Sequence, residues 1–273
     1  MEQDKIFGKV RSLLARREHD PGWGEHLLEL MLLAAEQAPA LHEEKLLPYL
    51  KGQRIDWPTP LTSATLDTIT AYREALPLAT YSMDLREEAL IGDEHPEYLP
   101  WSKREPHNLT PNHNLLANVS SLRLDTRLTI GNAFRVLLHD PSASDLRELT
   151  IKNHDTHPRS ICFFTEQDAE AIATAPGAHK WRKLDIGNSL QHRTFTLMLG
   201  ELKCEALREL DLSNNFIRET DREPPEWFSM LEKLDLSSCN FRANAVTKLF
   251  EKRAFPNLTT FSLSGNELRG RGL

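Results

Sequence analysis

The feature that most constrains this chain is an apolar pattern that recurs along its second half. Residues 207–217 have the spacing L-x-x-L-x-L-x-x-N-x-I, and the same spacing returns at 231–241 and 258–268. Weaker copies start at residues 119, 146 and 181, so the starts are 24 to 35 residues apart. Self-similarity at such a period is typical of stacked units, none of which can bury its apolar face alone.

Each unit has two parts. The alternation inside L-x-L predicts a short strand with one buried side. Apolar residues spaced by three or four predict helices between the strands, at Asn132–His139, Glu166–Ala175, Arg193–Lys203 and Ala243–Lys252. Asn at the ninth position can hydrogen-bond the backbone of the following turn, and a buried loop requires such partners. This position holds Asn215, Cys239 and Asn266, which we expect to form a structural ladder along the turns.

The segments Glu170–Asn188 and Leu207–Ile217 carry a family resemblance. They resemble the leucine-rich repeat superfamily, in particular its strand–helix subclass typified by ribonuclease inhibitor. The chain is also similar to bacterial multi-repeat proteins with a short helical block before the repeats. This resemblance covers residues 118–273. It implies an α/β solenoid with parallel strands on the concave side, helices on the convex side, and a role in protein–protein interaction.

The copies that start at 119, 146 and 181 depart from the pattern. They have Arg127, His154 and Ser189 at the Asn position, so we expect the turns of these three repeats to differ in geometry. The longest spacing, from 146 to 181, predicts an insertion at residues 153–164.

The first half of the chain has a different organisation. Apolar spacing predicts helices at residues 2–19, 25–38 and 42–50, so we assign 1–55 to a helical block or cap. Residues 56–117 are rich in proline and form a connecting region, either irregular or a degenerate further repeat. Within it, 63–76 is compatible with a helix.

Composition excludes several classes of protein. Lys and Arg total 33 against 40 Asp and Glu, a net charge of −7, which argues against nucleic acid as a partner. The chain has three Cys, too few for a disulfide-rich scaffold. It shows neither a secretory signal nor an apolar run long enough to span a bilayer. We therefore expect a cytoplasmic protein with reduced thiols and no membrane partner.

Catalytic and metal-binding motifs are absent from the sequence. It contains no phosphate-binding Gly-rich loop, no nucleophile elbow and no Cys-x-x-Cys pair. His154, Asp155 and His157 are the best metal candidates, but a polar surface loop explains them as well. The cluster at 107–113 fits a solvated loop, and Cys162 fits a buried core. We expect no metal, no cofactor and no catalytic residue, with a metal-dependent enzyme as the last alternative.

The remaining candidate site is the concave face of the strands. Its middle column reads Arg123, Thr150, Asp185, Asp211, Asp235 and Ser262. The column before it reads Ser121, Glu148, Lys183, Glu209, Lys233 and Thr260, and the column after it Asp125, Lys152, Gly187, Ser213, Ser237 and Ser264. Three successive Asp side chains can attract a basic partner segment. The alternative is that Leu-Asp-Leu is simply common in such repeats and that its Asp is solvated.

The sequence thus predicts a non-catalytic module that binds an unknown protein partner. In a second hypothesis the chain is a target-recognition subunit whose N-terminal helices recruit another protein. That role requires an exposed apolar stripe on 1–55, whereas a cap buries the stripe. The last repeat stops where its convex helix is due to begin. We therefore hypothesise that the chain is a piece of a longer repeat protein, or that a partner contacts its open C-terminal repeat.

Overall fold

The computed structural model describes residues 2–19, 22–53, 63–64, 66–77, 79, 81–86, 116–126, 131–153, 164–188, 192–217, 225–252 and 255–268. The chain divides into two compact units. The first comprises Met1–Asp84 with Asn118–Ser120, and the second Leu85–Ala117 with Ser121–Leu273.

Helices dominate the first unit. They are α1 (Glu2–Ala15), the 3-10 turn η1 (Arg17–His19), α2 (Trp23–Gln37), α3 (Pro39–Leu41), the π-helical η2 (His42–Leu46) and α4 (Leu47–Lys51). The helices predicted at 2–19, 25–38 and 42–50 are therefore present, broken near their ends. Their apolar stripes form a core in which Val10, Leu27, Met31 and Leu46 are inaccessible to solvent.

The proline-rich region also contributes regular structure to this unit. It forms β1 (Ser63–Ala64), α5 (Leu66–Ala75) and β2 (Tyr81–Arg86), and β1 pairs with β2 in parallel. Two buried polar contacts connect these segments. His42 Nε2 lies 2.8 Å from the carbonyl oxygen of Ala75, and the Tyr81 hydroxyl donates to the carbonyl of Leu76 at 2.8 Å. The helix expected at 63–76 is present as α5, whereas the strands β1 and β2 had no periodic signal in the sequence.

The second unit is built on short parallel strands. They are β3 (Val119–Thr126, which begins in the first unit), β4 (Glu148–Asn153), β5 (Lys183–Asp185), β6 (Glu209–Asp211), β7 (Lys233–Asp235) and β8 (Thr260–Ser262). Within the described chain, the strands β3 to β8 follow one another in chain order in one sheet. Each pairing from β3 to β8 is parallel and joins equivalent positions of neighbouring repeats.

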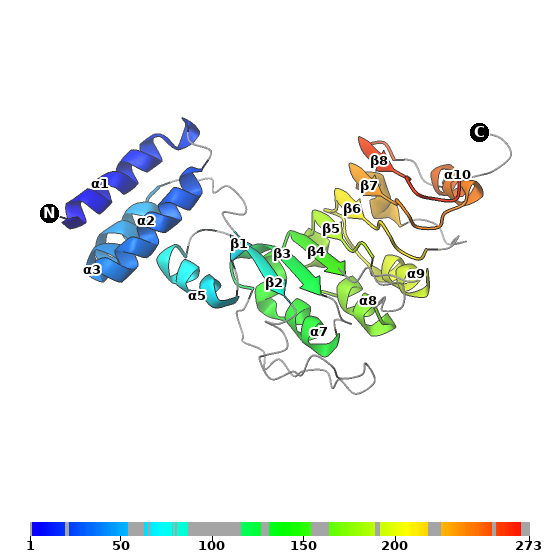
Figure 1. Cartoon of the computed structure of the whole chain (residues 1–273), viewed down its shortest axis with the longest axis horizontal. Helices are drawn as coiled ribbons and strands as arrows, with labels where there is room; N and C mark the ends of the chain where they lie inside the picture. The colour runs from blue at the N-terminus through cyan, green and yellow to red at the C-terminus, as the bar shows by residue number, and fades with distance from the viewer. Residues whose placement is uncertain are drawn as a thin grey trace. The chain divides into compact units, whose positions relative to one another are not determined.

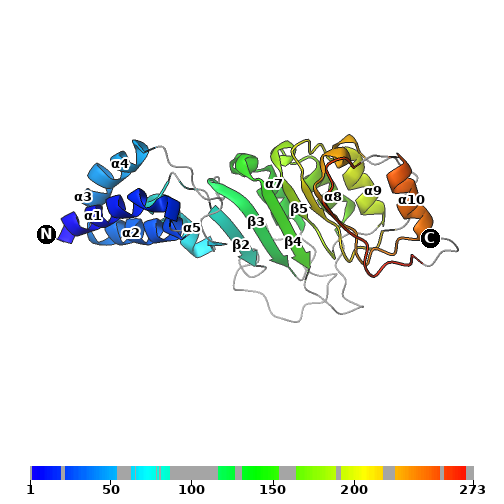
Figure 2. The ribbon, with the colours of Figure 1, turned by 90° about the horizontal axis from the view of Figure 1, so that it is seen from above.

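Helices α7 (Gly131–His139), α8 (Glu166–Ala173), α9 (His192–Glu201) and α10 (Ala243–Lys252) lie along one side of these strands (Figures 1 and 2). They occupy the four segments predicted to be helical. Shorter 3-10 turns precede three of the strands, namely η4 (Pro141–Asp145), η5 (Ala178–Lys180) and η6 (Glu226–Met230). The second unit is therefore an α/β solenoid with one layer of strands and one of helices.

The core of the solenoid runs between these layers. Leu184, Leu210 and Leu234 hold equivalent strand positions and are at most 2% exposed. Their equivalent in β8, Phe261, is only half-buried. Phe261 packs edge-on against Phe250 of α10 at 5.1 Å between ring centroids. Burial of the apolar ladder is thus complete in β5 to β7 and partial in β8.

Candidate interaction surface

The concave face is defined here as the side of β3 to β8 opposite α7 to α10. Parallel register aligns its middle column, Arg123, Thr150, Asp185, Asp211, Asp235 and Ser262, each beside the next. The preceding column, Ser121, Glu148, Lys183, Glu209, Lys233 and Thr260, is aligned in the same way. The strands therefore bring the candidate residues together in two straight rows.

The preceding row contains charges of alternating sign, and neighbouring side chains of the row contact each other. The ammonium Nζ of Lys233 donates to Oε1 of Glu209 at 2.7 Å, and Ser121 Oγ donates to Oε2 of Glu148 at 3.1 Å. The hydrogen bond to Glu209 and the charge of that carboxylate raise the pKa of Lys233. Because this pair is exposed, its contribution to stability is small.

The aspartates of the middle row hold the turns that follow their strands. Oδ1 of Asp211 accepts the backbone N–H of Ser213 at 2.8 Å, and Oδ1 of Asp235 accepts that of Ser237 at 2.8 Å. Asp185 makes a longer contact of the same kind with Gly187, at 3.4 Å. Asp211 and Asp235 thus hold the turns of their own repeats while remaining half-buried on the concave face. Asp185, which we expected on the binding surface, is only 5% exposed, because its carboxylate is drawn into the turn.

The turn position holds a continuous ladder between repeats. Asn215 Nδ2 donates to the carbonyls of Ile186 and Leu212, at 3.0 and 2.7 Å. Asn266 Nδ2 donates to the carbonyls of Leu236 and Leu263, at 2.6 and 2.9 Å. Each of these amides therefore joins its own repeat to the one before it.

Cys239 occupies the same position between them. Its thiol donates to the carbonyl of Leu212 in the preceding repeat, at 2.9 Å. Cys239 therefore makes the same contact with the preceding repeat that Asn215 and Asn266 make with theirs. Burial raises the pKa of this thiol to about 12, and burial raises that of Cys204 to about 12 as well. Both groups are therefore neutral at physiological pH, which fits structural thiols rather than nucleophiles.

The turns also require an unusual backbone conformation. Asn188, Asn214, Ser238 and Gly265 lie three residues after β5 to β8 respectively, and all have positive φ, from 55° to 70°. At Gly265 a side chain would meet Ser238 Oγ at 2.5 Å. Glycine suits this position because it adopts the left-handed conformation without a side-chain cost and leaves room for Ser238 Oγ, whereas Asn or Ser adopts the same conformation in the preceding repeats.

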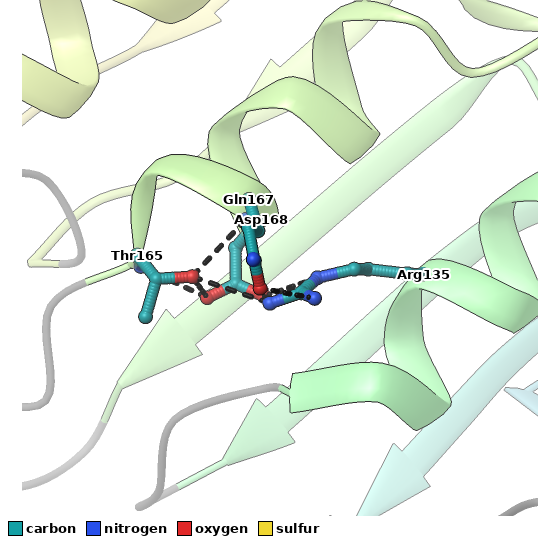
Figure 3. Close-up of polar contacts among 4 residues, drawn as sticks. All are labelled: Arg135, Thr165, Gln167 and Asp168. Carbon is teal, nitrogen blue, oxygen red and sulfur yellow. Dashed lines mark hydrogen bonds and ion pairs between the residues drawn. The ribbon is translucent and has the colours of Figure 1, made fainter.

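A polar cluster around one buried carboxylate connects two helices on the convex side (Figure 3). Asp168 of α8 is inaccessible to solvent, and its Oδ2 accepts the backbone N–H of Thr165 at 2.9 Å, completing a capping box. Its Oδ1 accepts from the Arg135 guanidinium of α7, at 3.2 Å from Nη2. Arg135 also donates to Gln167 Oε1 at 2.7 Å. The cluster stabilises the scaffold that carries the concave face.

Several predicted sites lie outside the described residues. These are His154, Asp155 and His157, the cluster at 107–113, Cys162, and the turn residues Arg127 and Ser189. Among the residues that the structure does describe, no group of three or more His, Cys, Asp or Glu side chains is placed to hold a metal ion. Within the same ranges, no helix is both long and apolar enough to cross a membrane.

Comparison with known proteins agrees with this architecture. Residues 206–231, which contain β6, match the family model described as Leucine Rich Repeat. No curated protein matches the chain. Together with the parallel sheet, the match identifies the fold as an α/β leucine-rich repeat solenoid with N-terminal helices. Solenoids of this kind are scaffolds for protein–protein interaction.

Proposed function

We propose that this chain is a non-catalytic scaffold of the ribonuclease-inhibitor-like subclass that binds a protein partner on its concave face. The observation that supports it most directly is the parallel register of β3 to β8, which aligns candidate side chains in rows. The strands are short, and the Asn215–Cys239–Asn266 ladder holds their turns. A surface ordered before binding loses little conformational entropy in the complex.

The charge of the middle row favours a basic segment of the partner. Glu209 is paired with Lys233, whereas Asp211 and Asp235 use Oδ1 for contacts with their own turns and remain half-exposed on the concave face. Equivalent residues of neighbouring strands lie about 4.8 Å apart, so a Lys- or Arg-containing segment can contact both carboxylates. Opposite charges across an interface increase both its specificity and its association rate.

The bacterial likeness and the cytoplasmic location remain predictions. Buried, neutral Cys204 and Cys239 are compatible with a reducing compartment.

The described apolar residues of the N-terminal helices lie mostly in their own core. Recruitment through an apolar stripe on 1–55 therefore lacks the exposed surface on which that hypothesis depends.

Site-specific photocrosslinking tests the concave face. A photoreactive amino acid replaces Thr150 on the concave face in one variant and the exposed Thr247 of α10 in the other. Each variant is expressed in the source cells. We expect a discrete crosslinked protein from position 150 only. No crosslink from position 150, or the same crosslink from both positions, contradicts the proposal.

Charge reversal then tests the role of the aspartates. We expect Asp211→Lys with Asp235→Lys to weaken binding of the crosslinked partner at least about tenfold, because like charges would face each other. The control reverses two exposed carboxylates elsewhere, Glu201→Lys with Glu251→Lys, and changes the net charge equally. Equal loss in both variants would show an effect of net charge and not of the concave face.

A further inference from the structure

The outer face of α1 differs in chemistry from the core it covers. Ile6, Val10, Leu13 and Leu14 are buried in the first unit. The opposite side of α1 is exposed. Its described exposed residues, together with Arg16 directly after the helix, are Lys5, Gly8, Lys9, Arg11, Ser12, Ala15 and Arg16. This set, named the α1 outer face, contains no carboxylate and no large apolar side chain.

Small residues form a strip along this face. Gly8, Ser12 and Ala15 are spaced by four and three residues, so they lie on one side of the helix. A side chain at Gly8 would meet nothing within 4 Å, and its φ is not positive, so neither crowding nor backbone geometry within the chain requires glycine. Glycine inside a helix lowers helix stability relative to alanine. The small strip lets another helix approach closely, since interaxial distance depends on the side chains at the contact.

Cations lie on both sides of the small strip. Lys5, Lys9 and Arg16 share one side at helical spacing, and Arg11 lies on the other. None of the ion pairs within the described chain involves them. Arg16 Nε donates to the carbonyl of Ser12, at 3.3 Å. The described part of this face thus presents four cations, on a chain whose net charge is −7.

We propose that the α1 outer face docks an acidic helix of a protein partner. The small strip fits the backbone of that helix, and the cations on either side fit its carboxylates. A lipid surface fits less well because the apolar side of α1 is buried. A nucleic acid fits less well because binding it takes a larger basic surface. This proposal does not depend on binding at the concave face, so an experiment can contradict either proposal without affecting the other.

A model ligand tests the proposal on the full chain. The probe is a labelled, stapled helix of about 20 residues, rich in Ala and Glu and long enough to be helical. Its control has Lys at every Glu position. Fluorescence anisotropy measures binding at low and high salt. We expect the Glu helix to bind, the Lys helix not to bind, and added salt to weaken the complex.

Two matched pairs of variants locate the contact. We expect Lys5→Glu with Lys9→Glu to weaken binding at least about tenfold, because carboxylates would then face the probe. Lys45→Glu with Lys51→Glu, which reverses two exposed cations of the same unit, should leave binding unchanged. Gly8→Leu should weaken binding by steric obstruction, whereas Gly8→Ala should retain it. Thermal unfolding establishes that each variant is folded.

Three results would overturn the proposal. The first is failure of the Glu helix to bind at low salt. The second is equal weakening by the two charge-reversal variants, which would indicate bulk charge alone. The third is tighter binding to phosphatidylserine vesicles than to the Glu helix, with the same loss on Lys5→Glu and Lys9→Glu, which would identify a membrane surface instead.

Discussion

Single side chains in this protein link one repeat to the next. Asn215 is 1% exposed and reaches the carbonyls of Ile186 in the preceding repeat and Leu212 in its own. A buried carbonyl that loses its hydrogen-bond donor destabilises the fold, because it has given up its hydrogen bonds to water without gaining another. One amide at the right position therefore stabilises two strands at once.

This role predicts a large effect from a small substitution. We expect Asn215→Ala to lower the free energy of unfolding by about 1 to 3 kcal/mol, since the Ile186 carbonyl loses its Asn215 donor and the Leu212 carbonyl keeps the weak Cys239 thiol donor. Urea denaturation followed by circular dichroism measures it. The control is the adjacent Asn214, which is exposed and has φ of 57°. Asn214→Gly should change stability by less than about 0.5 kcal/mol, because glycine accepts positive φ. Equal effects at the two positions would contradict the ladder.

At the scale of elements, polar contacts hold convex helices in place. The Arg135–Asp168 ion pair joins α7 to the first turn of α8 across 33 positions of sequence. Asp168 is fully buried, whereas 26% of the Arg135 side chain is exposed. Removing one partner leaves a buried carboxylate with only its capping contacts.

We expect Arg135→Met to lower the free energy of unfolding by about 1 to 2 kcal/mol. This is less than the loss expected on breaking a fully buried ion pair, because water reaches the Arg135 guanidinium. The methionine keeps much of the apolar stem and removes the charge. Arg182→Met, at an exposed position, is the control. Urea denaturation of both variants decides the question. A loss no greater than that of the control would show that the capping box alone satisfies Asp168.

At the scale of the whole molecule, stability depends on neighbouring repeats. Leu234 of β7 is 1% exposed and lies between its equivalents Leu210 and Phe261. Each repeat contacts only its neighbours, so a defect in one is transmitted along the stack. The half-buried Phe261 indicates that the stack is less well packed at β8.

We expect Leu234→Ala to lower the free energy of unfolding by about 2 to 5 kcal/mol through the cavity it creates. Hydrogen exchange should show lost protection in β6 and β8 as well as in β7. Glu205→Ala, on an exposed turn, should leave exchange in these strands unchanged. Lost protection confined to β7 would contradict stacking between neighbours.

The sequence by itself determined the repeat, its strands and the positions of its convex helices, because hydrophobic periodicity reflects local geometry. It also aligned the concave rows, since equivalent positions of stacked repeats meet in register. Tertiary structure alone decided that the proline-rich region adds the strands β1 and β2, which lack a periodic signal, whereas the sequence already indicated the helix α5. It also decided which polar groups meet. Lys233 with Glu209 and Arg135 with Asp168 are 24 and 33 residues apart, and such pairs depend on how side chains of adjacent repeats pack.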